Sequence, residues 1–321
     1  MNKKPIIIVA GEPNSVFLEI FFKSLKRNYY KSPLILIVNK KLLIKQMHHL
    51  GFNFKLNQIA LNSVNFEKLN NKKINIINVD YNFKNAFEKI SKKSNKYIKK
   101  SFKIALEILK KNKFSKFING PVSKRYFLEG KSLGITEYLA KQSKIKDEVA
   151  MLIFNDKLSV SPVTTHLALK DVHKYISKEK IKSHIRLISQ FYKKRFKKNP
   201  RIAITGLNPH CESNFNDCEE DAIISPTIKY LKNKKFRVEG PFPADTIFMQ
   251  KHLKKFDVIV GMYHDQVLSP MKALFGFDAI NITLGLPFVR ISPDHGPNSS
   301  MLGKNLSDPK SLMEALKFLD K

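Results

Sequence analysis

Short apolar runs of strand length alternate with amphipathic stretches of helical period along almost the whole chain. The run at 5–10 ends at a Gly-Glu-Pro turn, and the next segment, 16–25, carries apolar residues at helical spacing. The other expected strands and helices are 33–38, 41–50, 74–79, 95–112, 151–154, 158–163, a helix capped by Ser177, 202–205, 258–260 and 279–282. Such alternation is typical of an α/β protein with mainly parallel sheets. The segments 151–154 and 158–163 are expected to form an antiparallel hairpin instead.

Length and composition narrow the class of protein further. The chain has 321 residues, which suits two domains of roughly 150 residues each, and 43% of its residues are hydrophobic. No apolar run is long enough to span a membrane, and the short one after the first lysines is expected to be a strand rather than a signal peptide. The two cysteines, Cys211 and Cys218, predict no disulfide framework and favour a reducing cytoplasm.

The formal net charge of +31 raises the question of nucleic-acid binding. Lysine far outnumbers arginine, and the lysines are distributed along the whole chain rather than gathered in one segment. No zinc-finger spacing, RNP-like aromatic motif or basic heptad region is present. The sequence therefore predicts no specific nucleic-acid partner, and a basic nucleic-acid binder is the weakest of the alternatives.

Three histidines each follow a strand-like run. His166 closes LSVSPVTTH, His210 closes RIAITGLNPH and His264 closes FDVIVGMYH. Imidazole is a common metal ligand, and α/β sheets bind ligands at the carboxyl ends of their strands. The repetition predicts a divalent-metal site. The other histidines, except His295, lie in helical or polar contexts that are typical of solvated side chains; these are His48, His49, His173, His184 and His252.

Further polar residues follow the expected strands or lie near them. Asp245 is either the N-cap of a helix or part of the site, and Lys272 is by itself typical of a surface lysine. Arg290 is a stronger candidate than Lys272 for binding an anionic substrate, because arginine is scarce in this chain. Arginine binds phosphate and carboxylate groups strongly. His295 could be a fourth metal ligand, a proton shuttle or a partner of Asp294.

The chain has no G-x-G-x-x-G, P-loop or G-x-S-x-G motif. A standard dinucleotide site, a P-loop nucleotide site and a hydrolase of the G-x-S-x-G type are therefore disfavoured.

Taken together, these segments resemble the 4-hydroxythreonine-4-phosphate dehydrogenase family of pyridoxal phosphate biosynthesis. The blocks that carry the resemblance run in the family's order from Gly11 to about Gly296, and they are GEP, NGPVSK, SLGITEYLA, VTTHLALKDV, ITGLNPH, GPFPADTIF, MYHDQVLSPMK and NITLGLPFVRISPDHG. The resemblance implies a two-domain α/β/α fold of the isocitrate/isopropylmalate dehydrogenase type. It also implies a homodimer whose active site lies in the cleft between the domains, at the subunit interface. We expect residues 1–125 and 296–321 to form one domain and residues 126–295 to form the other.

The resemblance also implies residue roles. The metal ligands fall on His166, His210 and His264, with His264 supplied by the other subunit. The substrate contacts fall on Thr136, Lys272, Asn281 and Arg290. Lys272, Asp245 and Asp265 are the candidate catalytic residues, and the two aspartates are candidates for orienting the imidazoles. The resemblance further implies that NAD is the oxidant, bound without a glycine-rich motif, and that one divalent metal ion is bound, with Zn²⁺, Mg²⁺, Mn²⁺ and Co²⁺ as the candidates.

The implied reaction fits these side chains. A divalent metal held by the histidines would lower the pKa of the substrate's secondary hydroxyl, so that its proton could leave as hydride passes to NAD, and the product would resemble a β-keto acid that releases carbon dioxide. Lysine and arginine would hold the phosphate or carboxylate.

Two departures from the family's pattern keep alternatives open. Ile135 replaces the histidine of the family's G-H-T-E block, and the first loop, residues 14–19, is poor in glycine. The alternatives are a dehydrogenase of phosphorylated threonate or erythronate and a catalytically silent ligand-binding homologue.

Overall fold

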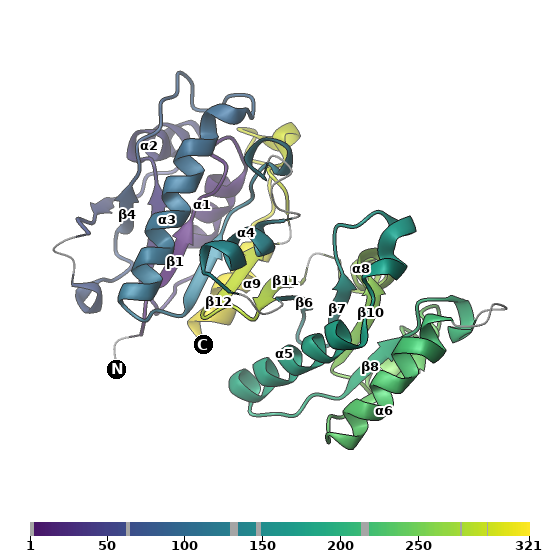
Figure 1. Cartoon of the computed structure of the whole chain (residues 1–321). Coiled ribbons are helices and arrows are strands. Elements are labelled where there is room, and N and C mark those ends of the chain that lie inside the picture. Colours follow the sequence, from purple (N-terminus) through teal and green to yellow (C-terminus); the bar gives the residue numbers. More distant parts are fainter. Residues whose placement is uncertain are drawn as a thin grey trace. The chain divides into compact units, whose positions relative to one another are not determined.

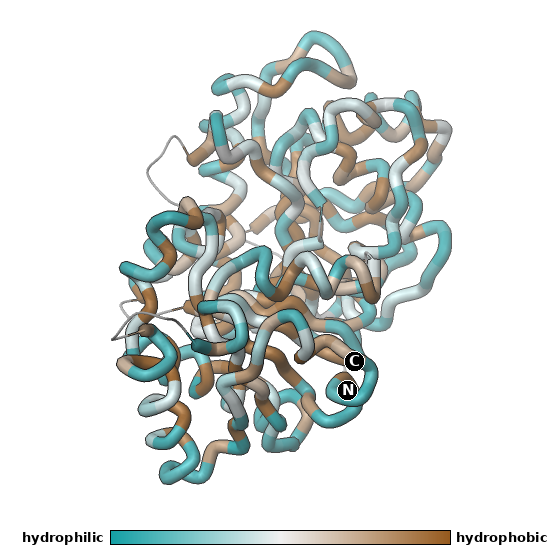
Figure 2. Tube along the Cα trace, turned by 90° about the vertical axis from the view of Figure 1, so that its right-hand side faces the viewer, coloured by the Kyte–Doolittle hydropathy of each residue, from teal (hydrophilic) through white to brown (hydrophobic). Residues whose placement is uncertain are grey.

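The computed structural model describes residues 3–61, 65–128, 134–145, 149–212, 218–276, 278–293 and 295–321. The chain divides into two compact units: unit 1 is Met1–Tyr138 with Pro287–Lys321, and unit 2 is Leu139–Leu286. The expected domains instead divided at 125/126 and 295/296. The described residues near the two ends of the chain lie side by side in unit 1 (Figures 1 and 2), where Lys3 Nζ donates to the carbonyl oxygen of Asp320.

Unit 1 contains a sheet in the order β3-β4-β2-β1-β5-β12, and every pairing described between its strands is parallel. The strands are β1 (Ile6–Val9), β2 (Leu34–Val38), β3 (Leu56–Gln58), β4 (Ile74–Asn78), β5 (Lys116–Asn119) and β12 (Val289–Pro293). The helices are α1 (Phe17–Arg27), α2 (Lys40–His49), α3 (Asn95–Lys111) and α9 (Lys310–Asp320), and α4 (Ile135–Gln142) crosses the boundary between the units.

The strands at the centre of this sheet are apolar throughout. β1 reads IIIV and β2 reads LILIV, and all nine residues are buried. Unbroken apolar runs are typical of parallel strands that are covered on both faces. Helix α3 packs on β1 and β2, α9 packs on β12, and α1 contacts both α2 and α9 (Figure 1).

Unit 2 contains a mixed sheet in the order β11-β6-β7-β10-β8-β9. Its strands are β6 (Ala150–Phe154), β7 (Ser159–Thr164), β8 (Ile202–Thr205), β9 (Val238–Phe242), β10 (Val258–Tyr263) and β11 (Ile280–Leu284), and its helices are α5 (Lys178–Phe196), α6 (Ser225–Asn233), α7 (Gln250–Leu253) and α8 (His264–Phe275). The expected hairpin is confirmed, because β6 and β7 are antiparallel. The pairings of β10 with β7 and with β8 are parallel.

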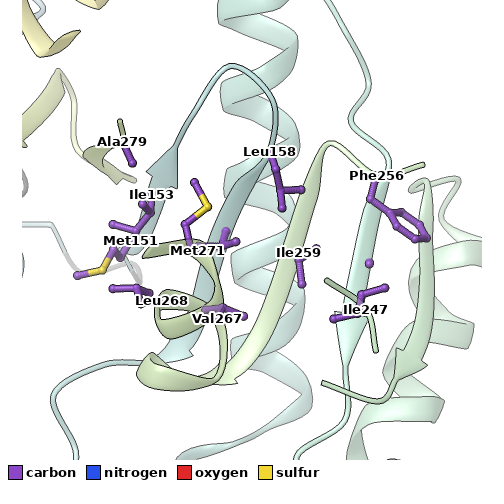
Figure 3. Packing of buried hydrophobic residues seen from close by; sticks show 12 residues of the cluster. Met151, Ile153, Leu158, Ile247, Phe256, Ile259, Val267, Leu268, Met271 and Ala279 are labelled. Carbon is purple, nitrogen blue, oxygen red and sulfur yellow. The ribbon is translucent and has the colours of Figure 1, made fainter. Parts of the chain in front are cut away.

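The core of unit 2 lies between the strands and α8. Helix α8 packs on β7 and β10, and its residues Val267, Leu268 and Met271 belong to one buried cluster with Val160 of β7 and Ile259 of β10. Figure 3 shows most of this cluster. The spacing of the three α8 residues is that of one helical face, so burial of this stripe fixes how the helix lies on the sheet. Strand β10 ends at Tyr263 and α8 begins at His264. Packing of α8 on the sheet therefore also fixes the position of His264.

Candidate metal and anion sites

The three sequence-predicted metal ligands follow three neighbouring strands of unit 2. Strands β7, β10 and β8 are adjacent and parallel, so their carboxyl ends lie at one edge of the sheet. His166 lies two residues beyond β7, His264 follows β10 directly, and His210 lies five residues beyond β8. The sheet therefore brings to one edge three segments that are far apart in the sequence.

Two of these imidazoles lie together in the same chain. The ring centroids of His166 and His264 are 5.7 Å apart, and the ring planes are inclined by 35°. Metal–nitrogen bonds of about 2.1 Å allow two rings on one ion a centroid separation of up to roughly 6 Å. The pair therefore fits a shared divalent ion. The resemblance had implied that His264 comes from the other subunit, whereas this geometry lets one chain supply both rings.

The third histidine lies on a different segment and has an unusual backbone conformation. His210 lies in the short helical turn η5 (Pro209–Cys211), where its φ is 57°, and His166 likewise has a φ of 50°. A positive φ is uncommon for a residue other than glycine, and such strain often occurs at functional sites. Across the described ranges, no group of three or more His, Cys, Asp or Glu side chains is placed to hold a metal. One chain thus supplies an imidazole pair and not a complete set of three.

Asp265 contacts the ring of His264. The Asp265 Oδ1 atom lies 2.7 Å from His264 Nδ1. A carboxylate oxygen accepts hydrogen bonds, so this contact favours the tautomer in which Nδ1 donates and Nε2 is the nitrogen left to bind a metal. Metal-bound histidines commonly have such a carboxylate partner, which sets both the tautomer and the orientation of the ring.

Asp245 lies in a turn and does not cap a helix. The nearest helix, α7, begins five residues later and has Met249 as its N-cap. Asp245 is exposed, and its charge acts on Cys211 next to His210. Burial raises the pKa of the Cys211 thiol, and the carboxylates of Glu220 and Asp245 raise it further. Because a thiol ligand must be deprotonated, this environment disfavours Cys211 as a metal ligand.

The two other predicted residues of unit 2 lie in different surroundings. Lys272 is exposed on α8, two turns after His264. Asn281 is half-buried on β11, where it is paired with Ile153. Its Oδ1 atom is buried without a hydrogen-bond partner. An acceptor in this state suits a ligand hydroxyl or ammonium group, because a buried polar atom left unpaired is unfavourable.

In unit 1, Arg290 lies in a buried polar cluster. Its side chain is only 1% exposed, Nε donates to Asn119 Oδ1 at 2.7 Å, and Nη1 donates to Thr136 Oγ1 at 3.3 Å. Burial lowers the pKa of the guanidinium to about 9, and the charge of Glu137 acts in the opposite direction. The group remains charged at neutral pH. A bound phosphate or carboxylate would stabilise this buried cation further.

The strand register explains this cluster. Arg290 of β12 pairs with Phe117 of β5, and Asn119 lies two residues further along β5 on the same face. Thr136 comes from the first turn of α4. Sequence reasoning predicted Arg290 and Thr136 but did not include Asn119 among the site residues. Only its position in the block after an expected strand could have indicated it.

The glycine-poor first loop is part of the core of unit 1. Gly11, with a φ of 78°, lies so close to the next loop that a Cβ atom there would be 2.4 Å from the Pro121 oxygen. Phe17 fills the space above Gly120, and Asn14 Oδ1 accepts from the amide of Glu88 at 2.9 Å. The residues that replace glycine in this loop are thus buried and hydrogen-bonded within unit 1.

Two histidines outside the predicted metal set have hydrogen-bond partners within the chain. The expectation that His184 is solvated is wrong: it is 3% exposed on α5, and its Nδ1 atom lies 3.2 Å from the Lys180 oxygen. It faces inward because it shares a helical face with Ile181, Ile185 and Ile188. His295 Nδ1 lies 2.9 Å from the Gly296 oxygen, and Asp294 is outside the described residues.

Comparisons with known proteins agree with this architecture. A family model for the pyridoxal phosphate biosynthetic protein PdxA matches residues 30–319. The chain is 39% identical to 4-hydroxythreonine-4-phosphate dehydrogenase of Sulfurihydrogenibium sp. (strain YO3AOP1), over 98% of this chain and 96% of that protein. It is also 39% identical to D-threonate 4-phosphate dehydrogenase of Pectobacterium atrosepticum, over 56% of this chain and 55% of that protein.

A solved structure of 4-hydroxythreonine-4-phosphate dehydrogenase from Klebsiella pneumoniae matches with a TM-score of 0.84 at 27% identity, over 98% of this chain and 97% of that one. The expected two-domain α/β fold is confirmed by this match and by the division into two units. In the part of the chain that the structure describes, no helix is both long and apolar enough to cross a membrane. The chain belongs to the family of the pyridoxal phosphate biosynthetic protein PdxA.

Proposed function

We propose that this protein is an NAD- and divalent-metal-dependent dehydrogenase of 4-phosphooxy-L-threonine. The product, 2-amino-3-oxo-4-(phosphooxy)butanoate, would lose carbon dioxide to give 3-amino-2-oxopropyl phosphate, which serves pyridoxal phosphate biosynthesis. The observation that carries the proposal is the His166–His264 pair, with centroids 5.7 Å apart at the carboxyl ends of neighbouring strands. It occurs in a chain that is 39% identical, over nearly its full length, to a protein named for this activity.

The histidines would hold the metal. His166 and His264 would each present a ring nitrogen, and His210 would complete the set; Zn²⁺, Mg²⁺, Mn²⁺ and Co²⁺ are all candidates. When bound, a divalent ion lowers the pKa of a coordinated hydroxyl and stabilises the developing carbonyl. Asp265 would keep His264 in the tautomer whose Nε2 faces the ion, through the 2.7 Å contact at Nδ1.

Other residues would hold the substrate. Arg290, supported by Asn119 and Thr136, would bind the phosphate or carboxylate through its buried guanidinium. Lys272 would add positive charge for the same anionic substrate, and Asn281 Oδ1 would accept a hydrogen bond from a hydroxyl or ammonium group. Together these contacts would fix the orientation of the substrate carbon that loses the hydride. NAD, when bound, accepts the hydride from that carbon.

A steady-state assay tests the proposal. Purified protein is incubated with 4-phosphooxy-L-threonine, NAD and each of the four metals in turn, and NADH is followed by absorbance. We expect turnover with at least one metal and its loss in the His166→Ala and His264→Ala variants. His173→Ala, which removes an exposed histidine of unit 2, is the matched control and should retain activity. Absence of NADH with every metal, together with tight substrate binding, would instead indicate a silent ligand-binding homologue.

A second substrate is favoured by one specific observation. Ile135, where the family's motif has histidine, lies beside Thr136 in the first turn of α4 and provides no hydrogen-bond donor to a phosphate. A relative that is 39% identical over its matched region is named for D-threonate 4-phosphate. The ratio of kcat/KM for the two substrates decides between them. If Ile135 selects D-threonate 4-phosphate, Ile135→His should shift this ratio toward 4-phosphooxy-L-threonine.

We also propose that the protein is a homodimer with a shared active site and that it acts in the cytoplasm. One chain brings two of the three histidines together, and the resemblance to the family implies that a second copy contributes to the same site. Both cysteines are free, which suits a reducing compartment. Light scattering of the purified protein measures the assembly directly, and a monomeric mass at assay concentration would contradict it.

A further inference from the structure

Gln266 joins the strand ends that precede two of the histidines. The residue is 7% exposed and lies two positions after His264 on α8. Its Oε1 atom accepts from the Met262 amide at 2.6 Å and from the Thr205 hydroxyl at 3.0 Å. Its Nε2 atom donates to the Gly206 oxygen at 2.8 Å. One side chain thus connects β10 to the end of β8.

The orientation of this amide is fixed by its partners. A backbone N–H can only donate and a backbone C=O can only accept. The atom that faces the Met262 N–H must therefore be the oxygen, and the atom that faces the Gly206 C=O must be the nitrogen. A side chain with both an acceptor and a donor is needed here. Glutamate would keep the acceptor but, when ionised, would place a negative charge against the Gly206 carbonyl.

The local sequence explains why the residue points backward. Gln266 is the third residue of α8, the position from which glutamine or glutamate reaches back to the helix start in a capping box. Here it reaches the amide of Met262, one residue before the N-cap Tyr263. Gly261 leaves room for it, because a Cβ atom there would lie 2.9 Å from Gln266 Oε1.

The same contacts extend to β7 and to the loop that carries His210. The Thr164 hydroxyl donates to the Met262 oxygen at 2.7 Å, so the end of β7 is tied to the same point of β10. On the far side of Gly206, Glu220 Oε1 accepts from the amides of Leu207 and Asn208 at 2.6 and 2.8 Å. The chain from Thr205 toward His210 is therefore held by buried side chains rather than by regular secondary structure.

We propose that Gln266 is a positioning residue for the metal site. It holds the start of α8, which carries His264, against the end of β8, from which the loop to His210 begins. This inference rests on the proposed metal-binding role of these histidines. Gln266 itself touches neither substrate nor metal, so its effect is on how well the imidazoles are arranged before an ion binds.

Metal affinity of the full-length protein tests this role. Zn²⁺ and Co²⁺ binding are measured by calorimetry after removal of bound metal with a chelator. We expect Gln266→Met and Gln266→Glu to weaken binding by about 10- to 100-fold, the range found when partners of metal ligands are removed. The Co²⁺ absorption bands should also shift in these variants, because they report the arrangement of the ligands. Gln190→Met, at an exposed position of α5, is the matched control and should bind as the unmodified protein does.

A milder pair of variants covers the case in which Gln266→Met does not fold. Thr205→Val removes one hydroxyl with little change of shape, and we expect metal binding weaker by about fivefold, as for the loss of one hydrogen bond. Thr205→Ser keeps the hydroxyl, and this variant should bind the metal as tightly as the unmodified protein does. Melting temperatures of the metal-free variants separate lost affinity from lost fold.

The outcomes are distinguishable. Weaker metal binding in folded Gln266 or Thr205→Val variants, with Thr205→Ser unaffected, supports the positioning role. Unchanged affinity and unchanged Co²⁺ bands in those variants would overturn it while leaving the proposed function intact. If the unmodified protein binds neither ion, and binds neither Mg²⁺ nor Mn²⁺ in the same measurement, the proposed function fails and the positioning role fails with it.

Discussion

Arg290 is a buried cation whose surroundings suit the binding of an anion. Replacing it with lysine removes the planar fork that contacts Asn119 and Thr136, and a lysine ammonium cannot reproduce that geometry. We expect Arg290→Lys to raise KM for the phosphorylated substrate by roughly 10- to 100-fold, which corresponds to one charge-assisted hydrogen-bonded contact. Steady-state NADH formation measures this change. Arg186→Lys, an exposed substitution on α5, is the control, and an unchanged KM for Arg290→Lys would remove Arg290 from the substrate site.

His184 makes stability depend on pH. Burial lowers its pKa to about 4 from an ordinary value of 6.5, so between these values the unfolded chain binds more protons than the folded one. The folded state therefore loses stability as pH falls through this window. The contribution of His184 should decrease by about 2 kcal/mol between about pH 8 and pH 5. Urea unfolding of the unmodified protein and of His184→Leu at both pH values measures it. An equal loss of stability in both proteins would contradict the assignment.

The residues differ in how far sequence alone could identify them. His166 and His264 were predictable because each ends a recognisable apolar run, and Arg290 because arginine is scarce in this chain. Asn119 was not assigned to the site, since its role depends on the register that pairs Arg290 with Phe117. The inward position of His184 follows from its place on a helical face among isoleucines, a pattern that the predicted helix already contained.

Helix α5 begins at a side-chain cap that the sequence predicts. Ser177 is the N-cap, and its side chain accepts from the Lys180 amide at 3.2 Å. Removing this acceptor leaves an amide of the first turn without its partner. Ser177→Ala should therefore lower the free energy of unfolding by about 1 kcal/mol. Ser189→Ala in the same helix does not affect the cap and is the control. Equal unfolding midpoints for the two variants in urea would show that the cap contributes nothing.

Element boundaries were less predictable than the elements themselves. The strand expected at 258–260 extends to Tyr263, because its pairing with β7 continues as far as Thr164. That extension places His264 directly at the start of α8, where Gln266 can reach back. The reading of Asp245 as a helix N-cap failed because helix α7 starts only at Gln250. Cross-strand pairing and helix packing decide such positions, and neither is visible in a local pattern.

At the scale of the whole chain, a long-range strand pairing helps to place the C-terminal segment in unit 1. Residues 287–295 were expected in the second domain, yet β12 pairs with β5. This pairing joins Arg290 to Asn119 across 171 sequence positions, and Pro287–Lys321 belongs to unit 1. The alternation of strands and helices predicts the α/β class, but it contains no information on which distant strands become neighbours.

The proposed sharing of the active site between two subunits can be tested by complementation. His264→Ala and Arg290→Met should each be inactive as homodimers. If His264 of one subunit serves the substrate-binding residues of its partner, a mixed dimer regains one site in which both residues are intact. Subunit exchange at equal concentrations makes half of the dimers mixed, so about a quarter of the unmodified activity should return. NADH formation before and after exchange measures the recovery, and light scattering confirms the dimer.

If both residues act within one chain, each mixed dimer has two defective sites and no activity returns. That outcome would assign His264 and Arg290 to a site of one chain, in agreement with the 5.7 Å separation of the His166 and His264 rings in the same chain.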